Sequence, residues 1–159
     1  MEVRLVAVSE RPDLAPLVAA WRVAAFSHLG TGTVEEATAE ILARPVGLEE
    51  TFVLLEGGRP VGTASFVRED MEARPDLTPW IASVFVEPAA RGRGHASMLV
   101  QHVEAFARAA GVPSLWLYTP DAEAFYLRLG WERVGTEQEK GYAVVLMRRR
   151  LSEPDQAPL

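Results

Sequence analysis

The chain alternates between segments with two different spacings of apolar residues. In one kind, apolar side chains recur every three or four positions, as Leu14, Val18 and Trp21 do, which is the spacing of one helix face. In the other kind, short runs rich in valine, leucine and phenylalanine predict strands. The expected helices are 12–28, 33–43, 96–110 and 122–129, and the expected strands are 3–8, 51–55, 61–67, 80–86, 114–118, 131–137 and 142–149. The resulting order, β-α-α-β-β-β-α-β-α-β-β, predicts an α/β (α+β) fold.

Turn signals support several of these boundaries. Thr33 and Glu36 have the spacing of a capping box, in which each side chain accepts a hydrogen bond from the other residue's backbone amide. Gly57 and Gly58 separate two β-rich runs and predict a hairpin. The charged, proline-containing segment 68–79 is expected to be a loop. We expect one domain over residues 1–151 and a flexible tail at 152–159.

The turn after the strand at 80–86 carries the clearest chemical signal. Gly92 and Gly94 alternate there with Arg91 and Arg93, just before a helix begins. Glycine lets the backbone come close to a ligand, and the first amides of a helix have no partner within that helix. Such amides, with arginine as countercharge, suit a pyrophosphate group. From the spacing alone, an ordinary glycine turn with solvated arginines remains the alternative.

Composition and motif spacing exclude several other classes of function. The chain has 159 residues and no cysteine, which excludes a cysteine acyl-enzyme and favours a reducing, cytoplasmic location. The turn lacks the Gly-Lys-Ser/Thr ending of a P-loop, and Ser97 stands where a dinucleotide fingerprint needs its third glycine. His28, His95 and His102 lack the spacing of metal ligands, so no metal is expected.

Charge and hydropathy bear on the partners of the protein. The net charge of −6 argues against nucleic acid and suits a cationic amine. No apolar run approaches the roughly eighteen residues that a membrane span needs, and the first residues do not resemble a signal peptide. We therefore expect neither a nucleic-acid nor a membrane partner.

Two blocks of sequence resemble the GNAT superfamily of acyl-CoA-dependent N-acyltransferases. Residues 91–96, Arg-Gly-Arg-Gly-His-Ala, are similar to its Arg/Gln-x-x-Gly-x-Gly/Ala loop, and Val-x-Val-x-Pro at 84–88 matches the lead-in to that loop. About thirty residues later, the β-like run 115–118 and the segment 122–131 resemble the family's later strand and helix. That helix carries alanine, then tyrosine four residues on, and ends in glycine and an aromatic residue. The resemblance is specific over roughly residues 80–135.

The resemblance implies a mixed, mostly antiparallel sheet of six to seven strands with helices on both faces. It also implies a splay between the fourth and fifth strands, 80–86 and 114–118. In the family, the pantetheine arm of acetyl-CoA, the co-substrate, fills this gap and binds main-chain atoms, here those of Phe85 and Val86. The residues implied to hold the pyrophosphate are Arg91, Gly92, Arg93, Gly94, His95, Ala96 and Ser97.

The same resemblance implies the catalytic residues. Tyr126 would protonate or stabilise the leaving thiolate, although a tyrosine in an amphipathic helix is otherwise expected in the core. Many relatives carry a glutamate where this chain has Ser83, which cannot itself deprotonate an ammonium but can hold a water. Thr119 stands where relatives often carry an asparagine that braces CoA. The acids that could line the acceptor side, or simply be solvated surface charges, are Glu35, Glu36, Glu69 and Asp70.

We therefore expect an N-acetyltransferase that moves acetyl from acetyl-CoA to a primary amine by direct attack in a ternary complex. The alternative is a CoA-binding or acyl-CoA-binding sensor without turnover, which the serine at position 83 favours. The acceptor is expected to be a small-molecule or peptide amine, and a homodimer is compatible with the resemblance. Trp21, Phe26 and Trp80 are expected in the core by residue type, with the alternative that Phe26 or Trp80 faces the substrate, because both adjoin loops that shape acceptor pockets in the family.

Overall fold

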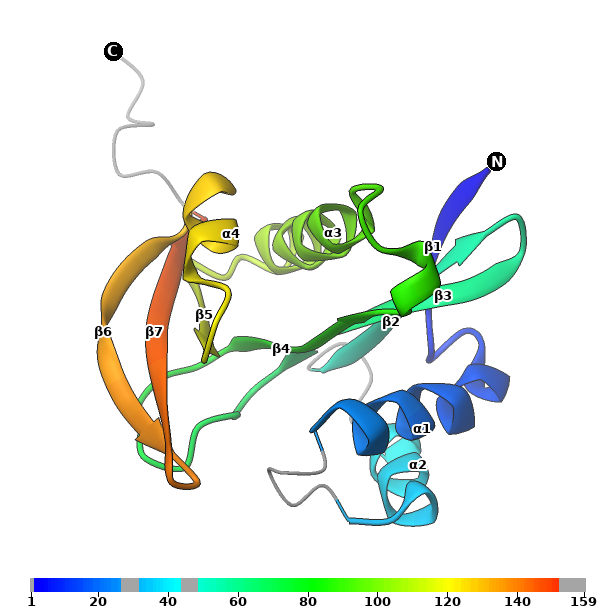
Figure 1. The fold of residues 1–159 in the computed structure, drawn as a ribbon, viewed down its shortest axis with the longest axis horizontal. Helices are drawn as coiled ribbons and strands as arrows, with labels where there is room; N and C mark the ends of the chain where they lie inside the picture. Colours follow the sequence, from blue (N-terminus) through cyan, green and yellow to red (C-terminus); the bar gives the residue numbers. More distant parts are fainter. Residues whose placement is uncertain (1, 27–31, 44–48, 152–159) are drawn as a thin grey trace.

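Seven strands form one mixed sheet in the order β1-β2-β3-β4-β5-β7-β6 (Figure 1). The structure, a computed structural model, describes residues 2–26, 32–43 and 49–151. The strands are β1 (Val3–Ala7), β2 (Glu50–Glu56), β3 (Arg59–Val67), β4 (Trp80–Val86), β5 (Ser114–Thr119), β6 (Glu132–Glu139) and β7 (Tyr142–Arg150). Every neighbouring pair is antiparallel except β4 and β5, which are parallel. The expected mixed, mostly antiparallel sheet is confirmed.

Helices cover both faces of this sheet (Figure 1). They are α1 (Ala15–Phe26), α2 (Val34–Ala43), α3 (His95–Ala109) and α4 (Glu123–Arg128). Strand β2 shows why helices are needed on both faces, because its successive apolar side chains point to opposite sides of the sheet. Phe52 and Leu54 are buried in one core with α3, whereas Val53 and Leu55 are buried in another with α1 and α2.

Most predicted boundaries agree with the structure to within two residues, and the exception lies near the start. The segment expected as one helix from residue 12 begins with a single 3-10 turn, Pro12–Leu14, before α1 starts at Ala15. Proline has no amide hydrogen to donate, and a second proline, Pro16, also restricts the first helical turn. The predicted capping box is confirmed, because Thr33 and Glu36 exchange side-chain-to-amide hydrogen bonds of 2.9 and 3.1 Å.

The strands β4 and β5 separate soon after they begin. Only Trp80 and Trp116 are paired between them in the described residues, and the Trp116 amide donates to the Pro79 carbonyl at 3.1 Å. Beyond this point β4 remains paired with β3, and β5 with β7. The edge of β4 that faces β5 therefore keeps main-chain amides and carbonyls without a strand partner, which confirms the expected splay.

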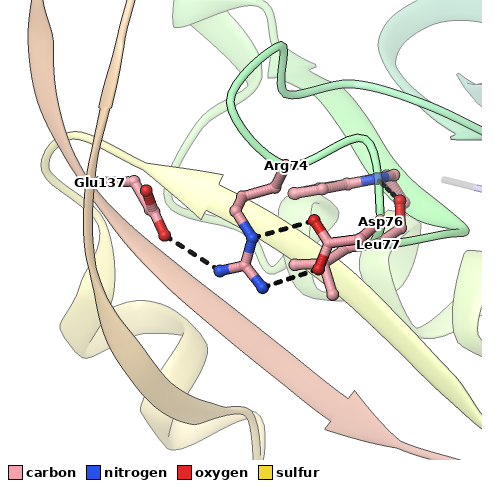
Figure 2. Close-up of polar contacts among 5 residues, drawn as sticks. Arg74, Asp76, Leu77 and Glu137 are labelled. Carbon is pink, nitrogen blue, oxygen red and sulfur yellow. Dashed lines mark hydrogen bonds and ion pairs between the residues drawn. The ribbon is translucent and has the colours of Figure 1, made fainter.

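The loop between β3 and β4 is anchored to the far edge of the sheet. Figure 2 shows Arg74 donating two hydrogen bonds to Asp76, at 3.1 and 3.0 Å, and a third to Glu137 of β6 at 3.0 Å. The Trp80 indole donates to the carbonyl of Leu77 in the same loop at 2.8 Å. These contacts hold the loop against β6, near the level of the C-terminal end of β5.

In the part of the chain that the structure describes, none of the helices is both long enough and apolar enough to cross a membrane. The predicted tail at 152–159 and the predicted helix end at His28 lie outside the described residues.

Candidate active site

The glycine turn connects the free end of β4 to α3. A 3-10 turn, Pro88–Ala90, follows β4, and the backbone then passes through Gly92 and Gly94 at φ of +80° and +82°. Only glycine adopts such angles without strain, so both positions require it. A Cβ added at either glycine would meet no atom within 4 Å, which leaves the space above the turn open.

The first turn of α3 presents free amides to this open space. Helix α3 begins at His95, and its first internal hydrogen bond runs from the Met98 amide to the Gly94 carbonyl at 3.1 Å. The amides of His95, Ala96 and Ser97 therefore have no partner within the helix. With the positive end of the helix dipole behind them, they can hold an anion such as a phosphate group.

The side chains of the turn are tied to neighbouring strands. Arg91 donates from Nε to the Val86 carbonyl at 2.9 Å and lies 5.8 Å from the Phe85 ring centre. Arg93 pairs with Glu56 at 3.0 Å, and the same Glu56 oxygen lies 3.1 Å from Nε2 of His95, whose side chain is only 4% exposed. Arg91, expected as a countercharge, thus holds the turn to β4. Arg93, the other expected countercharge, is half-exposed beside the Glu56 carboxylate.

Glu56 is a site neighbour that the sequence analysis missed. It is the last residue of β2 and lies next to the predicted hairpin, where a charged residue looks like ordinary surface. Only the pairing of β2 with β3, and the packing of α3 on β3 and β4, bring it to the glycine turn.

Ser83 lies at a β-bulge in the middle of β4. Thr63 is opposite Phe85 and Ser65 is opposite Ala82, so two residues of β4, Ser83 and its successor, face one residue of β3. Ser83 has a φ of +57°, a left-handed conformation that is uncommon for a residue with a side chain and costs about 1–3 kcal/mol. The bulge thus redirects β4 along the stretch where β5 has moved away.

Tyr126 lies in α4, on the same side of the sheet as α3 (Figure 1). Its side chain is 7% exposed and contacts the rings of Phe125 and Trp131, with centres 5.0 and 5.9 Å away. Burial, and secondarily the charge of Asp121, raises the pKa of Tyr126 to about 12. The phenol therefore stays protonated at neutral pH and can donate a hydrogen bond.

Thr119, the last residue of β5, supports the turn that leads into α4. Its buried hydroxyl accepts hydrogen bonds from the amides of Ala122, at 3.0 Å, and Asp121, at 3.4 Å. The position expected to brace the cofactor thus braces the segment that carries Tyr126.

The four candidate acids lie in different surroundings. Glu36 is engaged in the capping box, where hydrogen bonds from Thr33 lower its pKa, and Glu35 and Glu69 are exposed. Asp70 lies close enough to Tyr118 of β5 to affect it. Burial is the main cause that raises the pKa of Tyr118, and the negative charges of Asp70 and Glu139 raise it further. Glu139, which the sequence analysis did not single out, is 2% exposed, and burial raises its pKa.

The two aromatic residues considered for the acceptor side lie in different surroundings. Trp80 is fully buried and hydrogen-bonded to the Leu77 carbonyl, so it packs in the core. Phe26, the last residue of α1, is half-buried. A cavity of about 150 Å³ opens beside Val8, Ser9 and Glu50, and none of the predicted site residues in the described part of the chain lines it.

This geometry defines a fold shared with many solved acetyltransferase structures. One is yncA of Salmonella typhimurium, solved with its cofactor acetyl-CoA, which is 19% identical with a TM-score of 0.75 over 98% of each chain. Another is an aminoglycoside 6'-N-acetyltransferase complexed with coenzyme A, 14% identical with a TM-score of 0.74 over 98% of this chain and 100% of that one. Identities this low show a common fold.

Sequence comparison gives the family. Residues 17–131 match the model of the acetyltransferase (GNAT) family, and the chain belongs to that family. A curated relative, the protein YkzC of Bacillus subtilis (strain 168), is 30% identical over 82 residues, which are 47% of this chain and 56% of that protein. The match thus spans about half the length of this relative.

Proposed function

We propose that this protein is an N-acetyltransferase that transfers acetyl from acetyl-CoA to a primary amine in a ternary complex. One observation carries the proposal: the glycine turn and the free amides of α3 lie at the end of β4, where β4 has separated from β5. An anion site beside an unpaired strand edge suits a ligand with a pyrophosphate at one end and an amide-containing arm at the other.

The binding roles follow from this arrangement. The amides from Gly92 to Ser97 would hold the pyrophosphate, with Arg93 as countercharge. Main-chain groups of Phe85 and Val86 would pair with the pantetheine amides, as a neighbouring strand would. Arg91 would act indirectly, by holding the turn to the Val86 carbonyl.

The transfer requires three changes of bonding. The neutral amine attacks the thioester carbonyl carbon, a C–N bond forms, and the C–S bond then breaks to release the thiolate. Tyr126, whose phenol carries its proton at neutral pH, would donate its hydrogen to this sulfur or stabilise the charge. Before the attack, a water held by Ser83 would take a proton from the bound ammonium and pass it to bulk solvent, since a serine at neutral pH is not itself a base. The nitrogen loses a second proton as the amide forms, and this proton replaces the one that Tyr126 gives to the sulfur.

The rival function is a sensor that binds acetyl-CoA without turnover. Ser83 favours it, because a carboxylate is absent from a position where a general base would be expected. A buried tyrosine whose hydroxyl makes no hydrogen bond to any described residue favours the enzyme, since a binding module has no need of it.

The first test measures binding, because both functions require it. A ligand at one hundred times its Kd stabilises the folded state by about 2.7 kcal/mol, which for a chain of this size raises Tm by about 5–11 °C. We expect such a shift with acetyl-CoA, and no shift at saturating concentration would refute both functions.

The second test measures turnover and the role of Tyr126. Free CoA thiol released from acetyl-CoA is followed across a panel of small amines and peptides, and the absence of cysteine leaves the product as the only thiol. We expect turnover with one class of amine and a loss of about tenfold to thousandfold in Tyr126→Phe. Tyr142→Phe, the same change at a residue that is 46% exposed, is the matched control and should retain activity. Binding without turnover across the panel would favour the sensor.

A further inference from the structure

Helix α3 contains a buried carboxylate that the proposed chemistry does not use. The Glu104 side chain is 5% exposed, yet two donors reach it from the other half of the sheet. The Trp131 indole donates to one oxygen at 3.0 Å, and Nε of Arg149 donates to the other at 3.3 Å. A buried carboxylate without such partners would be strongly destabilising, so the three side chains form one unit.

This unit holds the turn between α4 and β6. Arg149 also donates to the Gly130 carbonyl at 2.9 Å, and the Trp131 amide donates to the Tyr126 carbonyl at 3.0 Å. Gly130 has a φ of +96°, and a Cβ there would lie 2.5 Å from the Arg149 guanidinium. The chain is thus fixed immediately after the helix that carries Tyr126.

The Trp131 ring transmits this constraint to the phenol. The ring centres of Tyr126 and Trp131 are 5.9 Å apart at an interplanar angle of 68°, and Trp131 is 2% exposed. Because the Tyr126 hydroxyl makes no hydrogen bond to any described residue, its direction depends on how the neighbouring rings pack. Whatever orients Trp131 therefore orients Tyr126.

We propose that Glu104 is a positioning residue that sets the direction of the Tyr126 phenol through Trp131. The proposal rests on the function proposed above, in which Tyr126 faces the leaving sulfur. It also assigns a second role to α3. The N-terminus of this helix lies at the phosphate turn, and its Glu104, nine residues further on, holds the catalytic side of the gap. The pyrophosphate site and the phenol are then placed by the same rigid element.

The test is a double-mutant cycle between Glu104 and Tyr126, measured on the full chain with the amine that supports turnover. Glu104→Met removes the hydrogen-bond acceptor and keeps the length of the side chain, whereas Glu104→Gln keeps an oxygen for the Trp131 indole. We expect Glu104→Met to lower kcat about tenfold or more with little change in KM for acetyl-CoA, and Glu104→Gln to retain most of the rate. In the Tyr126→Phe background, Glu104→Met should cause no further loss, because the group that it positions is already gone.

Two further variants keep the test decisive. If Glu104→Met does not fold, Trp131→Phe removes the same hydrogen bond, keeps a buried ring and should show the same dependence on Tyr126. Val18→Ala creates a cavity in the core that α1 and α2 cover, and it is the control for a loss of stability alone. This variant should leave kcat unchanged at temperatures well below its Tm.

Two results would overturn the proposal. One is an unchanged kcat in folded Glu104→Met, and the other is an equal loss from Glu104→Met in the wild-type and Tyr126→Phe backgrounds. If Tyr126→Phe alone left kcat unchanged, the role of Tyr126 in the proposed function would fail instead, so the two failures are distinguishable.

Discussion

Gly62 of β3 lies where the sheet leaves little room for a side chain, and the substitution Gly62→Ala tests that packing directly. Gly62 pairs with Val86 across the β3–β4 ladder. A Cβ at this position would lie 2.9 Å from the Phe85 carbonyl oxygen, 3.0 Å from Leu99 and 3.3 Å from Val86. Even a close contact between carbon and a carbonyl oxygen is about 3.3 Å. The Leu99 methyl group can rotate away, but the Phe85 oxygen belongs to the backbone, so β4 itself has to move.

The expected loss of stability follows from two opposing effects. Overpacking a buried site costs about 1–3 kcal/mol, whereas replacing glycine by alanine stabilises by about 0.4–1 kcal/mol through the unfolded state. The net loss is about 1–2 kcal/mol, which lowers Tm by roughly 2–8 °C in a chain of this size. The change should also weaken acetyl-CoA binding about twofold to tenfold, the value of one main-chain hydrogen bond, if Phe85 contacts the pantetheine arm.

The assay is thermal or urea unfolding together with titration of acetyl-CoA, and Gly135→Ala is the matched control. Gly135 lies in β6, and a Cβ there would meet no atom within 4 Å. We expect this variant to be unchanged or slightly more stable, with an unaltered Kd. If both variants had the same stability, the reasoning on close packing at Gly62 would be refuted. If Gly62→Ala were destabilised but bound acetyl-CoA with an unchanged Kd, the proposed role of Phe85 in cofactor binding would be refuted.

Two further predictions concern ionisable groups at the site. Because the pKa of Tyr126 is raised to about 12 in the folded state, the unfolded chain loses this proton first as pH rises from about 10, and folding stability falls across that interval. Between pH 9 and 11.5, the free energy of unfolding should fall by up to about 2 kcal/mol more in wild type than in Tyr126→Phe. Parallel plots of this free energy against pH for the two proteins would contradict the burial of this phenol. Glu56→Gln removes the anion beside Arg93 and His95, so the Kd of acetyl-CoA should fall about twofold to fivefold at low ionic strength, and this gain should shrink as salt is added. A higher Kd in Glu56→Gln would show instead that Glu56 stabilises the conformation of the glycine turn.

Local signals in the sequence were sufficient for the elements and for the phosphate turn. The hairpin at Gly57 and Gly58, the capping box at Thr33 and the start of α3 after Gly94 each depend on residues a few positions apart. Such features arise from backbone geometry and short-range hydrogen bonds, which the sequence states directly. The roles of Tyr126 and Ser83 came from the family resemblance and stay predictions.

Residues whose partners lie far along the chain could not be found in this way. Glu104 and Glu56 look like exposed charges on a helix and at a hairpin, yet one is buried beneath Trp131 and the other joins the phosphate turn. Arg91 likewise contacts β4 in a way that its position in a glycine turn does not suggest.

The sequence by itself determined the order of strands and helices, the glycine turn and, through two motif blocks, the acetyltransferase family. The tertiary structure alone decided where β4 and β5 separate, which strand edge is left unpaired and which carboxylates reach the site. The physical reason is the range of the interactions. Turns and helix ends are set by neighbours in sequence, whereas strand pairing and the partners of a buried charge depend on segments that meet only when the chain is folded.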